Sequence, residues 1–509
     1  MVDAPWQGDA CSLVDAFRDG ERTPLEELDA TLRAIASSDL NAFSFVDPDR
    51  ARDVARTADV SLPFGGVPTG IKELEPVTGW PHTEASLVFR NRVATTTSTL
   101  VERLLGRGGA VPVGLTTASE FGGLNVGVTK LNGVTHNPWR HDRTPGGSSA
   151  GSAAAVAGGL VTLATGGDGG GSIRIPAGYT GLLGMKGTYG RISRSPYAYS
   201  RPVTVVLGCL ARSVRDAARF FDVCAGYDLT DPSSLPSAGD WERSLGTHEL
   251  AGRRVAVLPS IGGVCAIAPA VEERVRDAAD ALVEETGMTR VDVDVAFPSL
   301  SAQWMMGNLA TLLAEIGDRW PACAPDLTDE VAIGLYTSQA LYNLNTAAVA
   351  EALRLRAYEA MARTFEQVDL VIAATNPDIA FAADATTSAT QRTFVDAARD
   401  STLARYAVRG VLAGIRAASA ASPRLPARLL DVVSRRMPDL VSMGALTMVS
   451  NICGNPAVSI PAGLVDGLPV GMQVLARHHE DALLFDVALA AQGCMPWPLV
   501  APAATPVFA

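Results

Sequence analysis

The sequence predicts an α/β fold, in which helices cover both faces of a largely parallel β-sheet. Short apolar runs alternate with stretches of helical periodicity along most of the 509 residues, and this alternation is typical of layered α/β proteins. Apolar residues make up 47% of the chain and charged residues 19%. That balance is the one expected of a globular protein with a large buried core.

The sequence pattern predicts the positions of several helices and strands. Residues 10–60 are expected to form helices, because apolar side chains recur there at helical spacing. A clearly amphipathic helix is expected over residues 270–285. Strands are expected at residues 110–115, 160–164, 254–258, 291–296, 370–374, 457–460 and 470–475.

The charge and the cysteine and histidine patterns limit the possible partners and cofactors. The net charge is −12. Because binding of nucleic acid requires a basic surface, we expect no nucleic-acid partner. The N-terminus lacks the features of a signal peptide and no apolar run is long enough for a transmembrane segment, so we expect a cytoplasmic protein. The seven cysteines are scattered, which favours reduced thiols, and the six histidines lack metal-ligand spacing. We therefore expect no metal and no cofactor.

Lysine is rare in this chain. Only three lysines, Lys72, Lys130 and Lys186, stand against 39 arginines among the 42 basic residues. Arginine supplies charge but does not give up its proton, whereas a desolvated lysine can become a neutral amine and act as a base. Lys72 is therefore a candidate catalytic residue, although a solvated or ion-paired side chain is the ordinary role of a single lysine.

Two glycine- and serine-rich loops lie in the same stretch of chain as the lysines. They read Gly-Gly-Ser-Ser-Ala-Gly-Ser at residues 146–152 and Gly-Gly-Asp-Gly-Gly-Gly-Ser-Ile-Arg-Ile-Pro-Ala at residues 166–177, which places Ser148 and Ser172 24 residues apart. An alanine-rich helix and one short strand are expected between the two serines. One helix and one strand can return the chain on itself, so we expect both loops at the same end of the sheet.

Further blocks keep the order and spacing of a known family. Gly-Val-Pro-Thr-Gly-Ile-Lys (66–72) precedes the loops, and Gly-Met-Lys-Gly-Thr-Tyr-Gly-Arg-Ile-Ser (184–193) and Leu-Ala-Arg-Ser-Val-Arg-Asp (210–216) follow them. Asn-Pro-Ala-Val-Ser-Ile-Pro-Ala-Gly (455–463) and Gly-Leu-Pro-Val-Gly-Met-Gln (467–473) stand near the C-terminus. With these blocks the chain resembles the amidase signature family of serine hydrolases over nearly its whole length.

The resemblance implies one α/β/α domain around a large mixed sheet, the amidase signature fold, over residues 1–509. It divides the chain into N-terminal helices (1–62), a signature core with the catalytic loops (63–234), a variable elaboration forming a substrate funnel (235–440) and closing core strands (441–509). The segment 235–440 matches the family least and is expected to set specificity.

The resemblance also implies a Ser-Ser-Lys catalytic triad. Ser172 is the implied nucleophile, Ser148 the relay and Lys72 the base, and the bond between Gly147 and Ser148 is implied to be cis. A serine hydroxyl becomes a good nucleophile when a base removes its proton, and a neutral lysine can do so through a bridging hydroxyl.

The glycines before Ser172 are expected to form an oxyanion hole. Backbone amides of Gly169, Gly170, Gly171 and Ser172 can supply preorganised donors, since glycine tolerates the positive φ values that such a nest requires. Three supporting residues are expected beside them. Asp168 is expected to cap this loop, Arg174 to brace it, and Ser149 to stand next to the relay.

The predicted function is that of a stand-alone amidase, which hydrolyses a small amide through an acyl-enzyme at Ser172. An alternative resemblance is the glutaminase A-type subunit of a tRNA-dependent amidotransferase, in which glutamine often stands at the position of Ile175. Another alternative is an α/β-hydrolase esterase with Ser149 as nucleophile, because residues 147–151 satisfy Gly-x-Ser-x-Gly. That esterase requires a downstream histidine, and the chain offers only His248, His478 and His479.

An arginine-rich segment at residues 401–437 has no assigned role. It carries seven arginines and one acidic residue in an otherwise acidic chain. A solvated helix face is the ordinary interpretation. A funnel wall, a subunit interface within a homodimer and a membrane-surface contact are the alternatives that the sequence leaves open.

Overall fold

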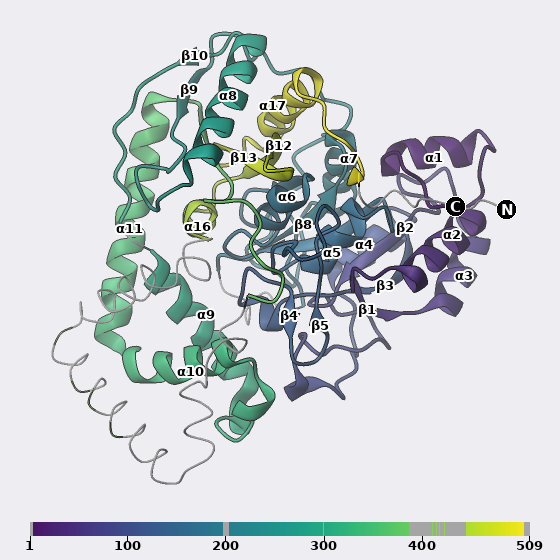
Figure 1. The fold of residues 1–509 in the computed structure, drawn as a ribbon, viewed down its shortest axis with the longest axis horizontal. Helices are drawn as coiled ribbons and strands as arrows, with labels where there is room; N and C mark the ends of the chain where they lie inside the picture. The colour runs from purple at the N-terminus through teal and green to yellow at the C-terminus, as the bar shows by residue number, and fades with distance from the viewer. Residues whose placement is uncertain are drawn as a thin grey trace.

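A single large sheet organises the molecule (Figure 1). The computed structural model describes residues 4–196, 203–298, 300–385 and 444–502, together with positions 410, 414, 417 and 422. The strands of the sheet are β1 (Phe43–Val46), β2 (Pro68–Lys72), β3 (Val111–Thr116), β6 (Leu163–Asp168), β7 (Leu183–Lys186), β8 (Val206–Ala211), β9 (Arg254–Val257), β10 (Thr289–Arg290), β11 (Leu370–Ala374), β12 (Ala457–Val465) and β13 (Leu468–Ala476). Their order across the sheet is β1-β3-β2-β6-β8-β7-β12-β13-β11-β9-β10.

The sheet is mixed, as the family resemblance implies. Six of its ten strand pairings are antiparallel and four are parallel. The expectation of a largely parallel sheet, drawn from the alternation of helices and strands, is therefore wrong. One reason is that the short turn Asp466-Gly467 joins β12 directly to β13, whereas parallel neighbours need a long crossover connection.

Helices cover both faces of the sheet. One face carries α1 (Ala10–Arg18), α4 (Thr99–Gly106), α7 (Val214–Cys224), α8 (Pro269–Thr286) and α17 (Asp481–Cys494), and the other carries α5 (Ala150–Ala157), α6 (Arg174–Thr180), α11 (Leu344–Gln367) and α16 (Ala445–Cys453). The N-terminal α2 (Pro24–Ser37) and α3 (Pro48–Arg56) pack on β3. The pair α9 (Ser301–Ile316) and α10 (Asp329–Leu341) lies at the opposite end from the N-terminal helices (Figure 1).

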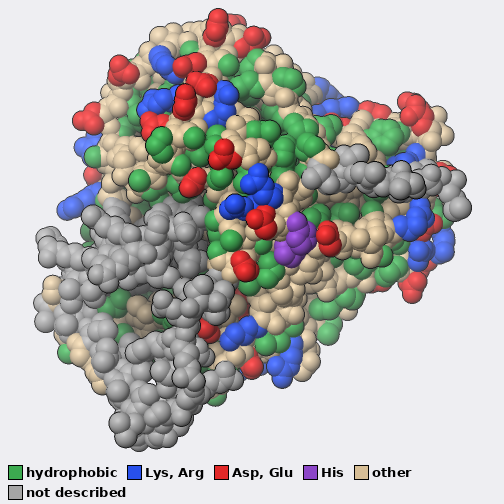
Figure 2. All heavy atoms as spheres, viewed as in Figure 1, with side chains coloured by type: hydrophobic (Ala, Val, Ile, Leu, Met, Phe, Trp, Pro, Cys, Tyr) green, Lys and Arg blue, Asp and Glu red, His purple; other side chains and the backbone are tan. Residues whose placement is uncertain are grey.

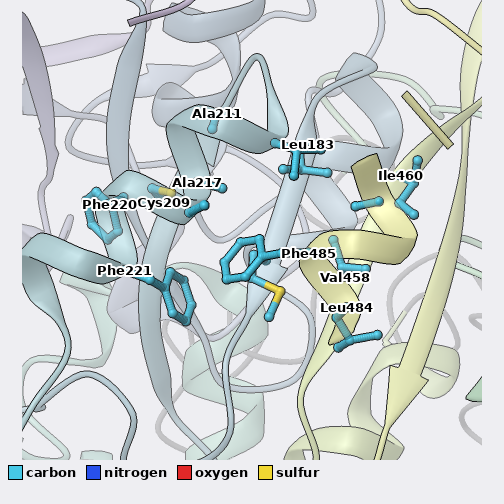
Figure 3. Packing of buried hydrophobic residues seen from close by; sticks show 14 of the residues in the cluster. Leu183, Cys209, Ala211, Ala217, Phe220, Phe221, Val458, Ile460, Leu484 and Phe485 are labelled. Carbon is cyan, nitrogen blue, oxygen red and sulfur yellow. The ribbon is translucent and has the colours of Figure 1, made fainter. Parts of the chain in front are cut away.

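The main core lies between the sheet and the first of these faces. Figure 3 shows Phe221 of α7 and Phe485 of α17 pointing toward one another over the strands, with ring centroids 5.2 Å apart. Successive residues of one strand serve opposite faces: in β12, Val458 packs in this core and Ala457 in the cluster beneath α11 and α16. This alternation follows from the two-residue period of a strand.

Most predicted helices and strands are present, but some differ in their bounds and one predicted strand does not form. Strands occur at or near residues 110–115, 254–258, 370–374, 457–460 and 470–475, and α8 covers the predicted amphipathic helix. The strand predicted at 160–164 instead runs over Leu163–Asp168, so part of the second glycine-rich stretch is strand. No strand forms at residues 291–296, because the sheet ends with the two-residue β10 immediately before them. The strand β1 interrupts the N-terminal region that was expected to be wholly helical.

This topology places the two serine loops together. β2 and β6 are parallel neighbours, with Thr69 opposite Leu163 and Gly70 opposite Ala164. The carboxyl ends of both strands therefore meet at one edge of the sheet. α5 returns the chain antiparallel to β6, so that the loops before α5 and after β6 lie at that same edge.

Candidate active site

Lys72 is the last residue of β2 and is buried, with 2% of its surface exposed. Its Nζ donates to the Ser148 hydroxyl at 2.9 Å and to the Gly167 carbonyl at 3.4 Å. Its backbone amide donates to Thr165 Oγ1 at 2.8 Å, which ties the end of β2 to β6. The side-chain amine of Lys72 is therefore held against a serine hydroxyl in a site largely closed to water.

Ser148 lies in the loop before α5. The peptide bond between Gly147 and Ser148 is cis, as the family resemblance implies. The Ser148 carbonyl accepts a hydrogen bond from the amide of Ser119 at 3.2 Å. A Cβ atom on Gly147 would stand 2.7 Å from Ser119 Oγ, so the close approach of these two loops requires glycine.

Ser172 stands directly before α6, and 6% of its surface is exposed. Its carbonyl accepts from the amide of Ser149 at 3.3 Å. This backbone bond holds the two serine loops side by side and confirms that they meet at one end of the sheet. The structure thus brings Lys72, Ser148 and the Ser172 segment together from three separate stretches of chain.

A buried ion pair anchors the loop that carries Ser172. Asp168 and Arg174 are both fully buried, and Arg174 Nε and Nη2 donate to the Asp168 carboxylate at 3.0 and 3.1 Å. Burial alone would raise the pKa of Asp168, but the charge and hydrogen bonds of Arg174, the charge of Lys186 and the hydrogen bond from Asn451 together lower the pKa to about 2. The carboxylate also accepts from the amide of Gly171 at 2.7 Å. Asp168 thus accepts from the backbone of the loop that follows it, and Arg174 binds the same carboxylate.

The Gly171 amide faces Asp168, which alters the expected set of oxyanion donors. Gly171 has a φ of +130°, a value that favours glycine. A Cβ atom there would stand 2.1 Å from Thr447 Oγ1. Thr447 Oγ1 in turn donates to the Gly170 carbonyl at 2.6 Å. Of the four amides predicted to form the hole, the Gly171 amide is thus committed to the loop itself.

Three residues near the C-terminus complete the site, and sequence reasoning missed all three. Arg174 donates to Gln473 Oε1 at 2.9 Å, to the Thr447 carbonyl at 2.8 Å and to Asn451 Oδ1 at 2.6 Å. Asn451 Nδ2 donates to the carbonyl and the carboxylate of Asp168, each at 2.8 Å. Gln473 lies in one of the family blocks, so that block was the one available signal.

The geometry does not support an esterase built on Ser149. The Ser149 side chain is fully buried, and its hydroxyl lies 3.4 Å from both the amide and the carbonyl of Gly167. His248 Nδ1 instead contacts Asp486 at 2.7 Å, and His478 Nε2 contacts the Cys453 carbonyl at 2.8 Å. His479 Nδ1 lies 3.4 Å from Arg191 Nη2. The contacts of all three histidines are thus with groups other than Ser149.

The rest of the described chain adds little to the site. All seven cysteines are free, and within the described ranges no group of three His, Cys, Asp or Glu side chains is arranged for a metal ion. In the same ranges no helix has both the length and the apolar character needed to cross a bilayer. Figure 2 shows acidic and basic side chains interspersed over the visible surface. The predicted arginine-rich segment 401–437 lies outside the described residues, apart from isolated positions.

Comparison with known proteins agrees with this architecture. The A subunit of glutamyl-tRNA(Gln) amidotransferase from Lacticaseibacillus paracasei is 30% identical, covering 94% of this chain and 95% of that protein. Among solved structures, a bacterial aryl acylamidase of the amidase signature family superposes with a TM-score of 0.82 at 25% identity, covering 98% of both chains. The A subunit of glutamyl-tRNA(Gln) amidotransferase from Thermotoga maritima superposes with a TM-score of 0.75 at 26% identity, covering 98% of this chain and 97% of that one.

The family match over residues 26–428 and the aryl acylamidase structure show an amide C–N hydrolase. Residues 26–428 match the amidase family, and the chain belongs to the amidase signature family.

Proposed function

We propose that this chain is a stand-alone amidase that cleaves a small-molecule amide through an acyl-enzyme on Ser172. The observation that carries the proposal is the buried hydrogen bond of 2.9 Å between Lys72 Nζ and Ser148 Oγ, beside the loop of Ser172. In this proposal Lys72 is the base, Ser148 the relay and Ser172 the nucleophile.

Acylation begins when the neutral amine of Lys72 accepts the proton of Ser148, as Ser148 takes the proton of Ser172. Ser172 Oγ then bonds to the substrate carbonyl carbon, and the carbonyl electron pair moves to oxygen. As that pair returns, the C–N bond breaks and Ser148 passes a proton to the departing amine, with Lys72 reprotonating Ser148. An ester on Ser172 and a free amine result.

Deacylation follows the same path in reverse, with water as the nucleophile. Water loses a proton through Ser148 to Lys72 and attacks the ester, and Ser172 leaves with a proton from the same relay. In both halves the oxyanion requires preorganised donors. Because the Gly171 amide binds Asp168, we assign the hole to the other three predicted amides, those of Gly169, Gly170 and Ser172.

The identity of the nucleophile can be tested directly. Ser172→Ala should abolish turnover while leaving the thermal unfolding temperature close to that of the parent, because it removes one hydroxyl group and keeps the backbone bond to Ser149. A fluorophosphonate probe should label Ser172, as read by peptide mass spectrometry. Labelling of Ser149, or turnover by Ser172→Ala, would disprove the assignment.

A second candidate is an amidotransferase subunit that passes ammonia from glutamine to a partner. It is favoured by the curated relatives, since the A subunit of glutamyl-tRNA(Gln) amidotransferase is 30% identical to this chain. Against it stands Ile175, which is fully buried in an apolar cluster with Tyr179 and Ala380. Glutamine often occupies this position in that subunit.

The two candidates differ in what the purified chain does alone. A stand-alone amidase should release amine from aryl or alkyl amides at a higher kcat/KM than it releases ammonia from glutamine. The amidotransferase component should instead prefer glutamine and gain activity when its partners are added. A panel that varies acyl and amine size separately would then define the substrate.

A further inference from the structure

A buried carboxylate links the catalytic edge of the sheet to the α9–α10 pair. Glu120 exposes 1% of its surface and accepts three hydrogen bonds. Ser86 Oγ donates to Oε1 at 2.7 Å, and the amide and hydroxyl of Thr328 donate to Oε2 at 2.7 and 2.6 Å. Burial raises the pKa of the Glu120 carboxyl, whereas the bonds from Thr328 and Ser86 lower it.

On its outer side, Glu120 holds the start of α10. Thr328 is the N-cap residue of that helix, and its amide has no partner within the helix, as is usual for a helix N-terminus. The carboxylate of Glu120 supplies the acceptor. The neighbouring Phe121 packs against the apolar cluster between α9 and α10, which includes Ile316 and Leu335. The loop at 119–123 is thus docked on the helical pair by both charge and apolar contact.

On its inner side, the same loop touches the proposed relay. The Ser119 amide donates to the Ser148 carbonyl at 3.2 Å, and Ser119 Oγ donates to the Val126 carbonyl at 2.6 Å. A Cβ atom on Gly122 would stand 3.5 Å from Ser148 Oγ. Residues on both sides of Glu120 and Phe121 therefore bear on Ser148.

The backbone of this loop is held in an unfavourable conformation. Phe121 has a φ of +53° and Gly122 a φ of +69°. A bulky residue in the left-handed region is strained and persists only where surrounding contacts impose it. Here the contacts that impose it are the bond from the Phe121 amide to the Glu84 carbonyl at 2.9 Å and the bonds of Glu120.

We infer that Glu120 is a positioning residue, which transmits the docking of α10 at Thr328 to the relay Ser148 through the strained 119–123 loop. This inference rests on the proposed function, because it requires Ser148 to carry a proton. The α9–α10 pair, which belongs to the predicted variable region 235–440, would then affect the rate of acylation as well as the choice of substrate.

The test uses two substrates with the same acyl group, an anilide and an activated aryl ester. The amine of the anilide must be protonated as it leaves, whereas the phenolate of the ester leaves unaided, so a displaced Ser148 slows the anilide more. Ser148→Ala sets the reference for this effect. Thr328→Val removes the hydroxyl bond to Glu120, and Glu120→Ala removes all three bonds. Glu120→Gln can keep three bonds, because its amide oxygen can accept from Thr328 and its amide nitrogen can donate to a reoriented Ser86 hydroxyl.

The matched control is Thr346→Val. Thr346 is a buried threonine in the same helical segment, and its hydroxyl accepts from the Asn343 amide at 2.7 Å at the start of α11. Its hydroxyl donates to the Leu341 carbonyl at 3.0 Å, so its bonds stay within the helical segment. Thr346→Val therefore removes a helix-capping hydroxyl that has no contact with the 119–123 loop. Its effect on kcat shows what the loss of a cap does by itself.

We expect Thr328→Val and Glu120→Ala to lower kcat for the anilide about tenfold more than for the ester, since small misplacements of a reacting group have effects of this order. Glu120→Gln and Thr346→Val should leave the anilide-to-ester ratio within about threefold of the parent. Adding Thr328→Val to Glu120→Ala should produce no further change, because both act through one bond network.

Equal losses on both substrates, or the same change of ratio in Thr346→Val, would overturn the inference and reduce Glu120 to a structural residue. If Ser148→Ala itself fails to separate the two substrates, the proposed relay is wrong. The reference variant therefore distinguishes failure of the inference from failure of the proposed function.

Discussion

The three lysines of the chain stand in three different environments. Lys72 Nζ contacts Ser148 Oγ at the edge of the sheet. Lys130 reaches across the surface to the Pro325 carbonyl at 3.1 Å and to the Asp329 carboxylate at 3.7 Å. Lys186 is fully buried in β7 and donates to the Gly187 carbonyl at 3.2 Å. Only the environment of Lys130 is one in which arginine could serve equally well.

We predict that Lys72→Arg is as inactive as Lys72→Ala. Arginine keeps the positive charge but does not release its proton, so the proposed relay would lose its base. Turnover of an amide substrate should fall by more than about a thousandfold in both variants, since the residues of a catalytic triad act as one unit. Lys130→Arg is the control and should retain near-parent turnover. Near-parent activity in Lys72→Arg would reduce Lys72 to an ion-pairing residue.

At this scale, sequence reasoning could name the candidate residues that stand in distinctive local patterns. Ser148, Ser172 and Lys72 could be named because they stand in glycine-rich or family blocks, and Asp168 and Arg174 because they stand in the same block as Ser172. Asn451 and Glu120 could not be named. Their roles come from partners hundreds of residues away, Asp168 and Thr328, and no local pattern encodes such pairings.

Among the elements, α16 determines how the Ser172 loop is held. Asn451 of α16 binds Asp168 and Arg174, and its Nδ2 also reaches the Thr204 carbonyl at 3.1 Å. Thr447, one turn earlier in the helix, binds the Gly170 carbonyl. The short helix therefore joins the β6–α6 loop to the segment that leads into β8.

We predict that Asn451→Ala destabilises the protein by about 2 to 4 kcal/mol, because it removes buried hydrogen bonds to the charged pair Asp168 and Arg174 and leaves the Asp168 carbonyl without its donor. Urea unfolding at neutral pH would measure the change. Ser450→Ala is the matched control, since this buried neighbour donates to the Thr447 carbonyl of its own helix, at 3.1 Å. Equal losses of unfolding free energy in the two variants would show that Asn451 contributes no more to stability than its neighbour Ser450.

The misplaced elements share a physical cause. Gly166 and Gly167 resemble loop residues, yet both lie in β6 opposite Gly208 and Leu207 of β8. A Cβ atom on Gly166 would stand 2.8 Å from Leu210 Cδ2, so the glycine serves close packing rather than turning. Residues 291–296 alternate as a strand does, but in the described part of the chain the sheet offers no further partner beside β10. Tertiary context overrides local pattern in both cases.

For the whole molecule, the burial of Lys186 in the centre of the sheet makes stability depend on pH. Burial, and after it the charge of Arg174, lowers the pKa of Lys186 to about 7. An unfolded lysine titrates at about 10.4. Between these values the unfolded chain binds a proton that the folded chain has released, so this residue makes stability rise with pH from about 7 to about 10.

We predict that Lys186→Met removes this dependence. Methionine fills a similar volume without a charge, so the parent should gain thermal stability relative to the variant as pH rises from about 7 to about 10. Scanning calorimetry of both proteins in matched buffers measures the difference, and other titrating groups cancel in it. Parallel curves over that range would show that Lys186 has an ordinary pKa in the folded state.

The position of β12 and β13 in the middle of the sheet bears on how the chain is synthesised. β7 ends at Lys186 and its neighbour β12 begins at Ala457, so 270 residues (187–456) are translated between them. At about 5 to 20 residues per second, the ribosome takes roughly 15 to 50 seconds over that interval. Throughout it the nascent chain presents an open strand edge to other nascent chains. We therefore expect the yield in a foreign host to depend on translation rate and chaperone supply more than on the stability of the finished enzyme.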